Sequence, residues 1–226
     1  MSGNTTAVNT PLNQSFGADA ALCACGGVAL TVQNTRVEGN ALSITALATD
    51  SGPSGPIALE ADGDATSITN TRIDANTGVV TTSGDTAALF GAVGFFSPGD
   101  LANTLTSSSV SNNTATANAP NGDASVFGVG VFNNGPLVVG GSTIGGNRGR
   151  ANGQSGLAQG GGIWNGQFFG GDTSPLTLQG SRVTGNVLSG SPGVTLAGGG
   201  IYTVGFPTTL LGTLVAGNAP DQCDGC

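Results

Sequence analysis

The stretch Gly160–Asn186, GGGIWNGQFFGGDTSPLTLQGSRVTGN, is one copy of a unit that occurs six times in this chain. Each copy holds a Gly-rich segment ending in an apolar residue, a variable loop, a segment of alternating apolar and hydroxyl residues, and a closing Asn. We anchor the copies on Val37, Ile73, Val110, Ile144, Val183 and Val215. The anchors lie from 32 (Val215 minus Val183) to 39 (Val183 minus Ile144) residues apart, and a repeat of this length predicts stacked structural units.

Three further positions agree in all six copies. An apolar residue precedes each anchor by five residues, a hydroxyl residue precedes it by two, and Asn follows it by three. The Asn column is Asn40, Asn76, Asn113, Asn147, Asn186 and Asn218. A stacked Asn can bond the side chains above and below it and satisfy backbone groups of a turn. We therefore predict a structural Asn ladder.

The alternation of apolar and hydroxyl residues within each copy determines the fold class that we expect. In Leu176-Thr177-Leu178 the apolar side chains point one way and Thr the other, which is the period of a β-strand. A unit of two or three such strands cannot bury its apolar face alone, whereas stacked units form a continuous core. Helices are disfavoured because the chain holds 41 Gly and 10 Pro. The sequence predicts an all-β, single-domain parallel β-solenoid of about six coils.

The GGGI(W/Y) segment followed by L-x-L-x-x-(S/T)-x-V-x-G-N resembles the repeat of right-handed parallel β-helix proteins. It is similar to the pectate-lyase-like superfamily and, within it, to polymorphic outer-membrane and related surface proteins with GGxI and xGN repeats. The resemblance covers about residues 26–218 and implies a right-handed β-helix there. It does not imply one activity, because this fold hosts lyases, hydrolases, tailspikes, adhesins and scaffolds.

The repeat also divides the chain. Residues 1–25 are expected to form an N-terminal arm or cap, residues 26–218 the β-helix, and residues 219–226 a C-terminal tail. The disulfide candidates lie at the two ends: Cys23, Cys25, Cys223 and Cys226. The stacked coils separate the two pairs too far for a bridge within one chain. The alternatives are local pairing, free thiols in end caps, and bonds across a junction between copies.

Net charge and cysteine content limit the classes of partner and the cellular location that can be expected for this chain. The net charge is −8, with 13 acidic residues, five Arg and neither Lys nor His, which argues against nucleic-acid binding. No apolar run of about 18 residues predicts insertion into a membrane. The even cysteine count favours an extracellular or cell-surface location, although the first 20 residues do not read as a signal peptide.

Aromatic residues follow the first apolar segment in four successive copies. They are Phe96, Phe132, Trp164 and Tyr202. Strand alternation places them opposite the core, so we expect an outward ladder of rings that binds sugars or another flat ligand. The alternative is that the rings pack on one another beneath loops such as residues 165–175.

Charged residues offer weaker candidates. Glu60, Asp62 and Asp64 surround a Gly turn and form a calcium candidate, with a solvated acidic turn as the alternative; no other cofactor is predicted. Arg36 and Arg72 directly precede two anchors, and acidic residues follow both anchors, which predicts exposed charge pairs. No catalytic residue is predicted, because the chain lacks His and Lys and its carboxylates are scattered over different copies.

We therefore expect a non-catalytic, secreted or cell-surface β-solenoid that serves as a structural or adhesive module. It is expected to stack end to end into filaments and to contact polysaccharide or another cell-surface ligand through the aromatic ladder. The alternative function is a polysaccharide lyase or glycoside hydrolase of the pectate-lyase-like fold.

Overall fold

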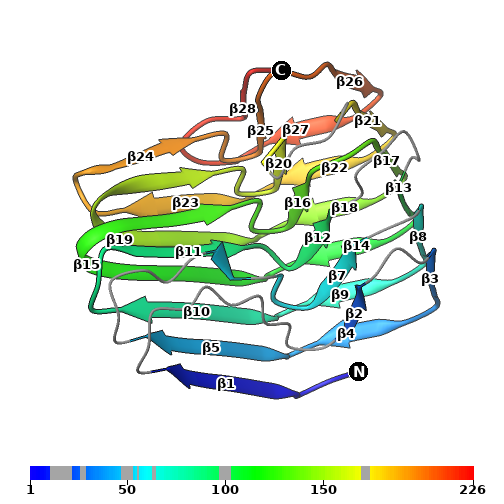
Figure 1. The fold of residues 1–226 in the computed structure, drawn as a ribbon. Helices are drawn as coiled ribbons and strands as arrows, with labels where there is room; N and C mark the ends of the chain where they lie inside the picture. Colours follow the sequence, from blue (N-terminus) through cyan, green and yellow to red (C-terminus); the bar gives the residue numbers. More distant parts are fainter. Residues whose placement is uncertain are drawn as a thin grey trace.

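The computed structural model describes residues 1–10, 22–25, 29–46, 53–54, 56–62, 65–96, 103–168 and 174–226. These residues form 28 strands and no helix, and hence no helix long and apolar enough to cross a membrane. The strands assemble into four parallel sheets that run along one axis (Figure 1). This arrangement confirms the predicted all-β parallel solenoid.

Three of the sheets correspond to segments of the repeat. The first-strand sheet consists of β2 (Leu22–Cys25), β7 (Leu59–Asp62), β12 (Val93–Phe95), β16 (Val131–Asn133), β20 (Ile163–Asn165), β25 (Ile201–Thr203) and β28 (Cys223–Asp224). The second-strand sheet consists of β3 (Leu30–Gln33), β8 (Thr66–Thr69), β13 (Asn103–Thr106), β17 (Leu137–Gly140), β21 (Leu176–Gln179) and β26 (Thr208–Leu211). The anchor sheet consists of β4 (Arg36–Glu38), β9 (Arg72–Asp74), β14 (Ser109–Ser111), β18 (Thr143–Gly145), β22 (Arg182–Thr184) and β27 (Leu214–Ala216). The six rungs of the last two sheets give about five full turns, close to the predicted six coils.

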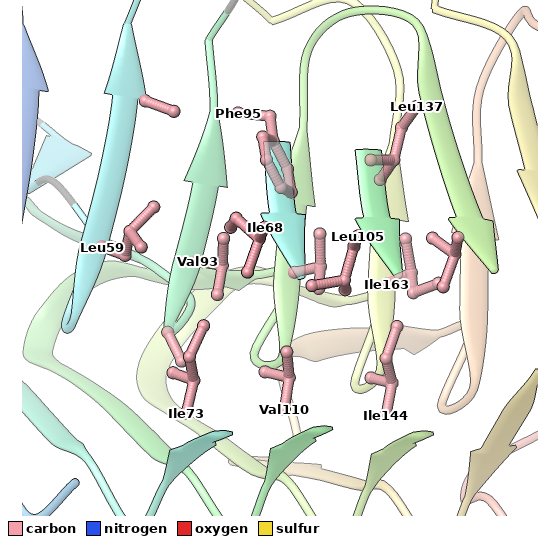
Figure 2. Packing of buried hydrophobic residues seen from close by; sticks show 14 of the residues in the cluster. Leu59, Ile68, Ile73, Val93, Phe95, Leu105, Val110, Leu137, Ile144 and Ile163 are labelled. Carbon is pink, nitrogen blue, oxygen red and sulfur yellow. The ribbon is translucent and has the colours of Figure 1, made fainter. Parts of the chain in front are cut away.

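Equivalent residues of successive copies pair directly. The anchor Ile144 lies between Val110 and Val183 in the register of β14, β18 and β22. All three side chains are fully buried, and Figure 2 shows the anchors stacked beneath the inner residues of the other sheets. The main core is therefore a set of columns of like side chains, as expected when each coil lies in register on the next.

A wing extends from this three-sided core, and the repeat pattern did not predict it. Its sheet consists of β1 (Thr5–Thr10), β5 (Ala41–Ala46), β6 (Pro53–Ser54), β10 (Thr77–Thr82), β11 (Thr86–Phe90), β15 (Thr114–Phe127), β19 (Arg148–Gln159), β23 (Val187–Gly190) and β24 (Val194–Ala197). The chain enters the wing directly after Asn40, Asn76, Asn113, Asn147 and Asn186 of the ladder, and the wing has a second row of strands, here called its second limb, that leads back toward the core. In β15 and β19 one bent strand makes both limbs.

Small residues let the two limbs of the wing approach each other. The wing core is rich in Ala, including Ala115, Ala117 and Ala124, which are fully buried. At the bend, Gly122 lies against the turn of the preceding coil, where a Cβ would lie 1.9 Å from the carbonyl oxygen of Asp85. Only a residue without a side chain fits there.

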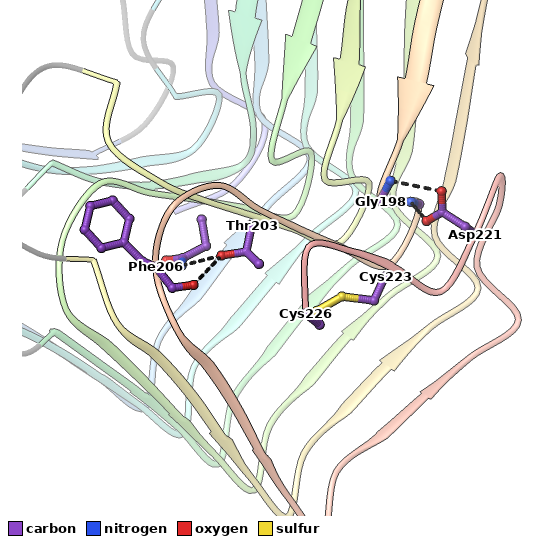
Figure 3. The surroundings of a disulfide bond; sticks show 8 residues. Gly198, Thr203, Phe206, Asp221, Cys223 and Cys226 are labelled. Carbon is purple, nitrogen blue, oxygen red and sulfur yellow. Dashed lines mark hydrogen bonds between the residues drawn. A yellow bond between two sulfur atoms is a disulfide. The ribbon is translucent and has the colours of Figure 1, made fainter.

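The C-terminal residues fold back onto the last coil as a compact cap (Figure 3). β28 pairs with β25, and the predicted local disulfide Cys223–Cys226 is confirmed. The carboxylate of Asp221 accepts hydrogen bonds from the backbone N–H groups of Gly198 and Gly199. These contacts tie the cap to the Gly-rich turn that precedes β25.

Cys23 is also disulfide-bonded, and the part of the chain that the structure describes holds no free cysteine. The side chain of Cys25 lies outside the described residues. Cys223 and Cys226 are bonded to each other, so they are not available to lock a junction between two copies. The expectation of a disulfide across such a junction is therefore wrong for the C-terminal pair.

Candidate functional site

The aromatic column lies at the corner between the first-strand sheet and the wing rather than on an open face. Phe132 and Trp164 are adjacent in the register of β16 and β20, and their rings stack with centroids 4.6 Å apart and planes 6° apart. Phe132 is fully buried and Trp164 is 3% exposed. The indole N–H of Trp164 donates to the side-chain oxygen of Gln159 on the wing.

Rings from the wing close this corner. Phe90 on β11 and Phe127 on β15 point away from the wing core, toward the outer face of the first-strand sheet. The centroid of Phe90 lies 4.3 Å from that of Phe132, and the centroid of Phe127 lies 6.2 Å from that of Trp164. The sequence did not point to these two residues, because the wing was not predicted. Each directly precedes the Gly-rich segment of its copy, before Gly91 and Gly128, and this shared position is the signal that could have found them.

Phe168 covers the corner from outside. Its ring packs edge-on against those of Phe90, Phe127, Phe132 and Trp164, with centroids 5.4 to 6.0 Å away. Phe168 is 41% exposed, whereas Phe132 and Trp164 beneath it are not. The burial of these two rings favours the packing interpretation of the column. The ring surface that a ligand can reach belongs to Phe168 and to the half-buried Phe96 and Tyr202.

Phe96 does not occupy the register that the sequence suggested. Gly94, two residues earlier, pairs with Phe132, and Val93 rather than Phe95 pairs with Val131. A Cβ on Gly94 would lie 2.4 Å from the ring of Phe96, so that ring folds back over the vacant position. Residues two apart in a strand face the same side, so alternation could not detect the shift. We call Phe90, Phe96, Phe127, Phe132, Trp164, Phe168 and Tyr202 the aromatic corner.

The Asn column forms a continuous buried ladder. The Nδ2 of Asn147 donates to Oδ1 of Asn186 (2.9 Å) and to the carbonyl oxygen of Val110 (3.1 Å). Its Oδ1 accepts from the backbone N–H (3.1 Å) and the Nδ2 (3.0 Å) of Asn113. The same pattern recurs along Asn40, Asn76, Asn113, Asn147, Asn186 and Asn218.

Residues outside the repeat extend this ladder at both ends. Asn4 donates to Asn40 at one end, and Asn218 donates to the side-chain oxygen of Gln222 at the other. The hydroxyl column forms a second ladder, in which Ser142 accepts from the backbone N–H of Ser108 and donates to a backbone carbonyl. The side chains of these two columns are therefore hydrogen-bonded within the stack.

The acidic turn is only partly described. Glu60 lies on β7 and is half-buried, in the register of Gly94 and Phe132. Asp62 ends β7, but its side chain and Asp64 lie outside the described residues. Among the residues that the structure describes, no group of three or more His, Cys, Asp or Glu could hold a metal ion. The calcium candidate stays a prediction.

The predicted charge pairs meet on the outer face of the anchor sheet. Arg72 on β9 contacts the carboxylate of Asp74 and, at 3.0 Å, that of Glu38 on β4. Burial raises the pKa of Asp74, but hydrogen bonds from Arg72 and Asn112, the Arg72 charge and the backbone N–H of Ala75 outweigh it and lower the pKa overall. Asp74 is therefore held as a carboxylate.

We expect Asp74→Asn to lower stability at neutral pH. A carboxyl group whose pKa is lowered by folding stabilises the protein above its unfolded pKa of about 3.9, and this contribution is lost as the pH falls through the folded value. The gap between wild type and Asp74→Asn in urea midpoint should therefore narrow below about pH 4. A gap that stays constant from pH 7 to pH 3 would contradict this role.

Comparison with protein-family models, with curated proteins and with solved structures finds no match for this chain.

Proposed function

We propose that this chain is a non-catalytic structural and adhesive module, secreted or displayed at a cell surface, that contacts glycans through the aromatic corner. The observation that carries the proposal is that the repeated Asn and hydroxyl side chains are hydrogen-bonded inside the stack. Each Asn bonds the next Asn of its column, and hydroxyls such as that of Ser142 accept from the backbone of the neighbouring coil, which is the chemistry of a scaffold. The repeat therefore builds a rigid support for whatever its surface contacts.

Two further features support the surface location. The repeats resemble those of pectate-lyase-like surface proteins, in which a right-handed β-helix presents its faces to the outside. The disulfide Cys223–Cys226 is typical of proteins that fold in an oxidising compartment.

The aromatic corner supplies the contact surface. Sugar rings present apolar C–H faces that pack against aromatic rings, and Phe168 offers an exposed ring on a base of buried ones. Because Phe132 and Trp164 are stacked and fixed in the register of two strands, the ring above them is supported on a rigid platform.

Binding to polysaccharide can be followed by the fluorescence of Trp164, the one Trp in the chain. We expect a soluble polysaccharide from a panel of neutral and acidic glycans to shift its emission. Phe168→Ala should weaken that binding about tenfold, the loss of about 1.4 kcal/mol of ring contact, and keep the fold because the ring is partly exposed. The matched control is Phe206→Ala, a half-buried Phe outside the aromatic corner.

Three results would decide against the proposal. Unchanged emission with every glycan of the panel would remove the glycan contact, as would equal binding by wild type and Phe168→Ala. Release of reducing or unsaturated sugar ends by the purified chain would replace the adhesive role with the lyase or hydrolase alternative.

A further inference from the structure

The C-terminal face of the solenoid exposes apolar side chains of its last two core strands, β26 and β27. Leu210 on β26 continues the column of Leu178, which is fully buried, but Leu210 is 40% exposed. Leu211 and Leu214 are 50% and 44% exposed, and they continue the outward-facing positions of Gln179 and Arg182, so they lie at the rim of this face. Both β26 and β27 are end strands of their sheets, so their outer backbone edges are open to pairing among the described strands.

The N-terminal face has a recess. Among the described strands, β2 and β3 end their sheets there, whereas Ser2 bridges to Glu38 beyond the first anchor strand and β1 pairs beyond β5. This step leaves a hollow of about 470 Å³ against β2 and β3. Its lining includes the apolar residues Met1, Leu22, Leu30, Val32 and Val37.

The C-terminal face has the opposite step. The cap strand β28 extends the first-strand sheet one rung beyond β25, while β26 and β27 end the two other core sheets. A strand therefore projects from one end on the same sheet that is recessed at the other end. When two copies point in the same direction along one axis, the projecting strand β28 of one copy faces the recess of the other.

We propose that a second copy of this chain stacks head to tail on the first, with its β28 cap entering the recess against β2. In this arrangement Leu210 and the cap of one copy cover Leu30 and Leu22 of the next, with Leu211 and Leu214 at the rim of the junction. The inference rests on the proposed structural role and does not need the glycan contact. The junction is non-covalent, because Cys223 and Cys226 are bonded to each other within the cap.

Charge favours this orientation over a symmetric one. Asp224 is exposed on the C-terminal cap, and Arg36 is exposed on the first anchor strand at the other end. Joining two C-terminal ends would bring like charges together, whereas head-to-tail contact brings opposite ones to the same junction. A contact between two different surfaces that repeats along one axis does not close into a ring, so it generates filaments.

Light scattering over a range of protein concentrations tests the inference on the full chain. Wild type should exceed the monomer mass of 21.8 kDa several-fold at high concentration. The double variant Leu210→Asp with Leu214→Asp should stay monomeric with an unchanged far-UV spectrum. The matched control Leu157→Asp, a 37% exposed Leu on the side of the wing, should assemble like wild type.

Mixing two blocked variants distinguishes the orientation. Leu30→Asp blocks the N-terminal recess, and it also replaces the first test if the double variant fails to fold. Each blocked variant alone should be monomeric, and an equimolar mixture should stop at a dimer through the one intact pair of faces. Dimerisation of either blocked variant alone would overturn the head-to-tail arrangement, as would a wild type that stays at 21.8 kDa throughout.

The two proposals can fail separately. A monomeric wild type that still shifts its Trp164 emission with a glycan would overturn only the stacking. Filaments that bind no glycan would overturn only the adhesive contact.

Discussion

Replacing Ile163 or Val183 with Asp is expected to prevent folding. Both side chains are fully buried in the main core, between equivalent residues of the coils on either side. An aspartate there would place an unpaired charge in the middle of a column, at a cost above about 4 kcal/mol. Soluble yield and the far-UV spectrum would report the loss.

Thr177→Asp is the matched control. Thr177 lies on β21 between Leu176 and Leu178, which are buried, and its own side chain points outward and is half-buried. We expect this variant to lose about 1 kcal/mol or less. Equal damage from Thr177→Asp and Val183→Asp would show that the assignment of inner and outer positions is wrong.

Asn147→Ala is expected to destabilise the protein by about 3 kcal/mol. The change removes the acceptor for two N–H groups of Asn113 and the donor to Oδ1 of Asn186, all in a fully buried site. Buried donors left without partners cost about 1–3 kcal/mol each, and relaxation of the stack offsets part of the sum. Denaturant midpoints measured by intrinsic fluorescence would give the difference.

The control for the ladder is Asn121→Ala. Asn121 is exposed at the bend of the wing and makes one long contact, 3.5 Å, to a backbone carbonyl. We expect its loss to change stability by about 0.5 kcal/mol or less. If Asn147→Ala and Asn121→Ala had the same denaturant midpoint, the buried ladder would stabilise the protein no more than an exposed Asn does.

The sequence by itself determined the parts of the fold that repeat at fixed offsets. The anchor, the apolar residue five positions before it, the hydroxyl and the Asn recur in every copy, and the structure stacks each set into one column. Parallel, in-register pairing requires like positions to lie on one another, so a repeat with constant internal spacing predicts the columns directly.

Tertiary structure decided what surrounds those columns. The wing follows the Asn of the first five copies through segments of variable sequence. Only its packing against the outer face of the first-strand sheet brings Phe90 and Phe127 onto Phe132 and Trp164. A strand pattern says which side a residue faces, but not whether another part of the chain covers that side. The aromatic residues were therefore placed outside the core by their sequence and buried by a neighbouring sheet.

The register of the third copy and the ends of the solenoid were also decided only in three dimensions. Phe96 directly follows β12, two residues after Gly94, so a period of two could not tell which of them continues the aromatic column. In the structure Gly94 takes that position, and the ring of Phe96 lies over it. Residues 219–226 read as a tail because they lack the repeat. They become a cap because β28 pairs with an open strand edge and Asp221 and Gln222 satisfy backbone groups that the last coil exposes.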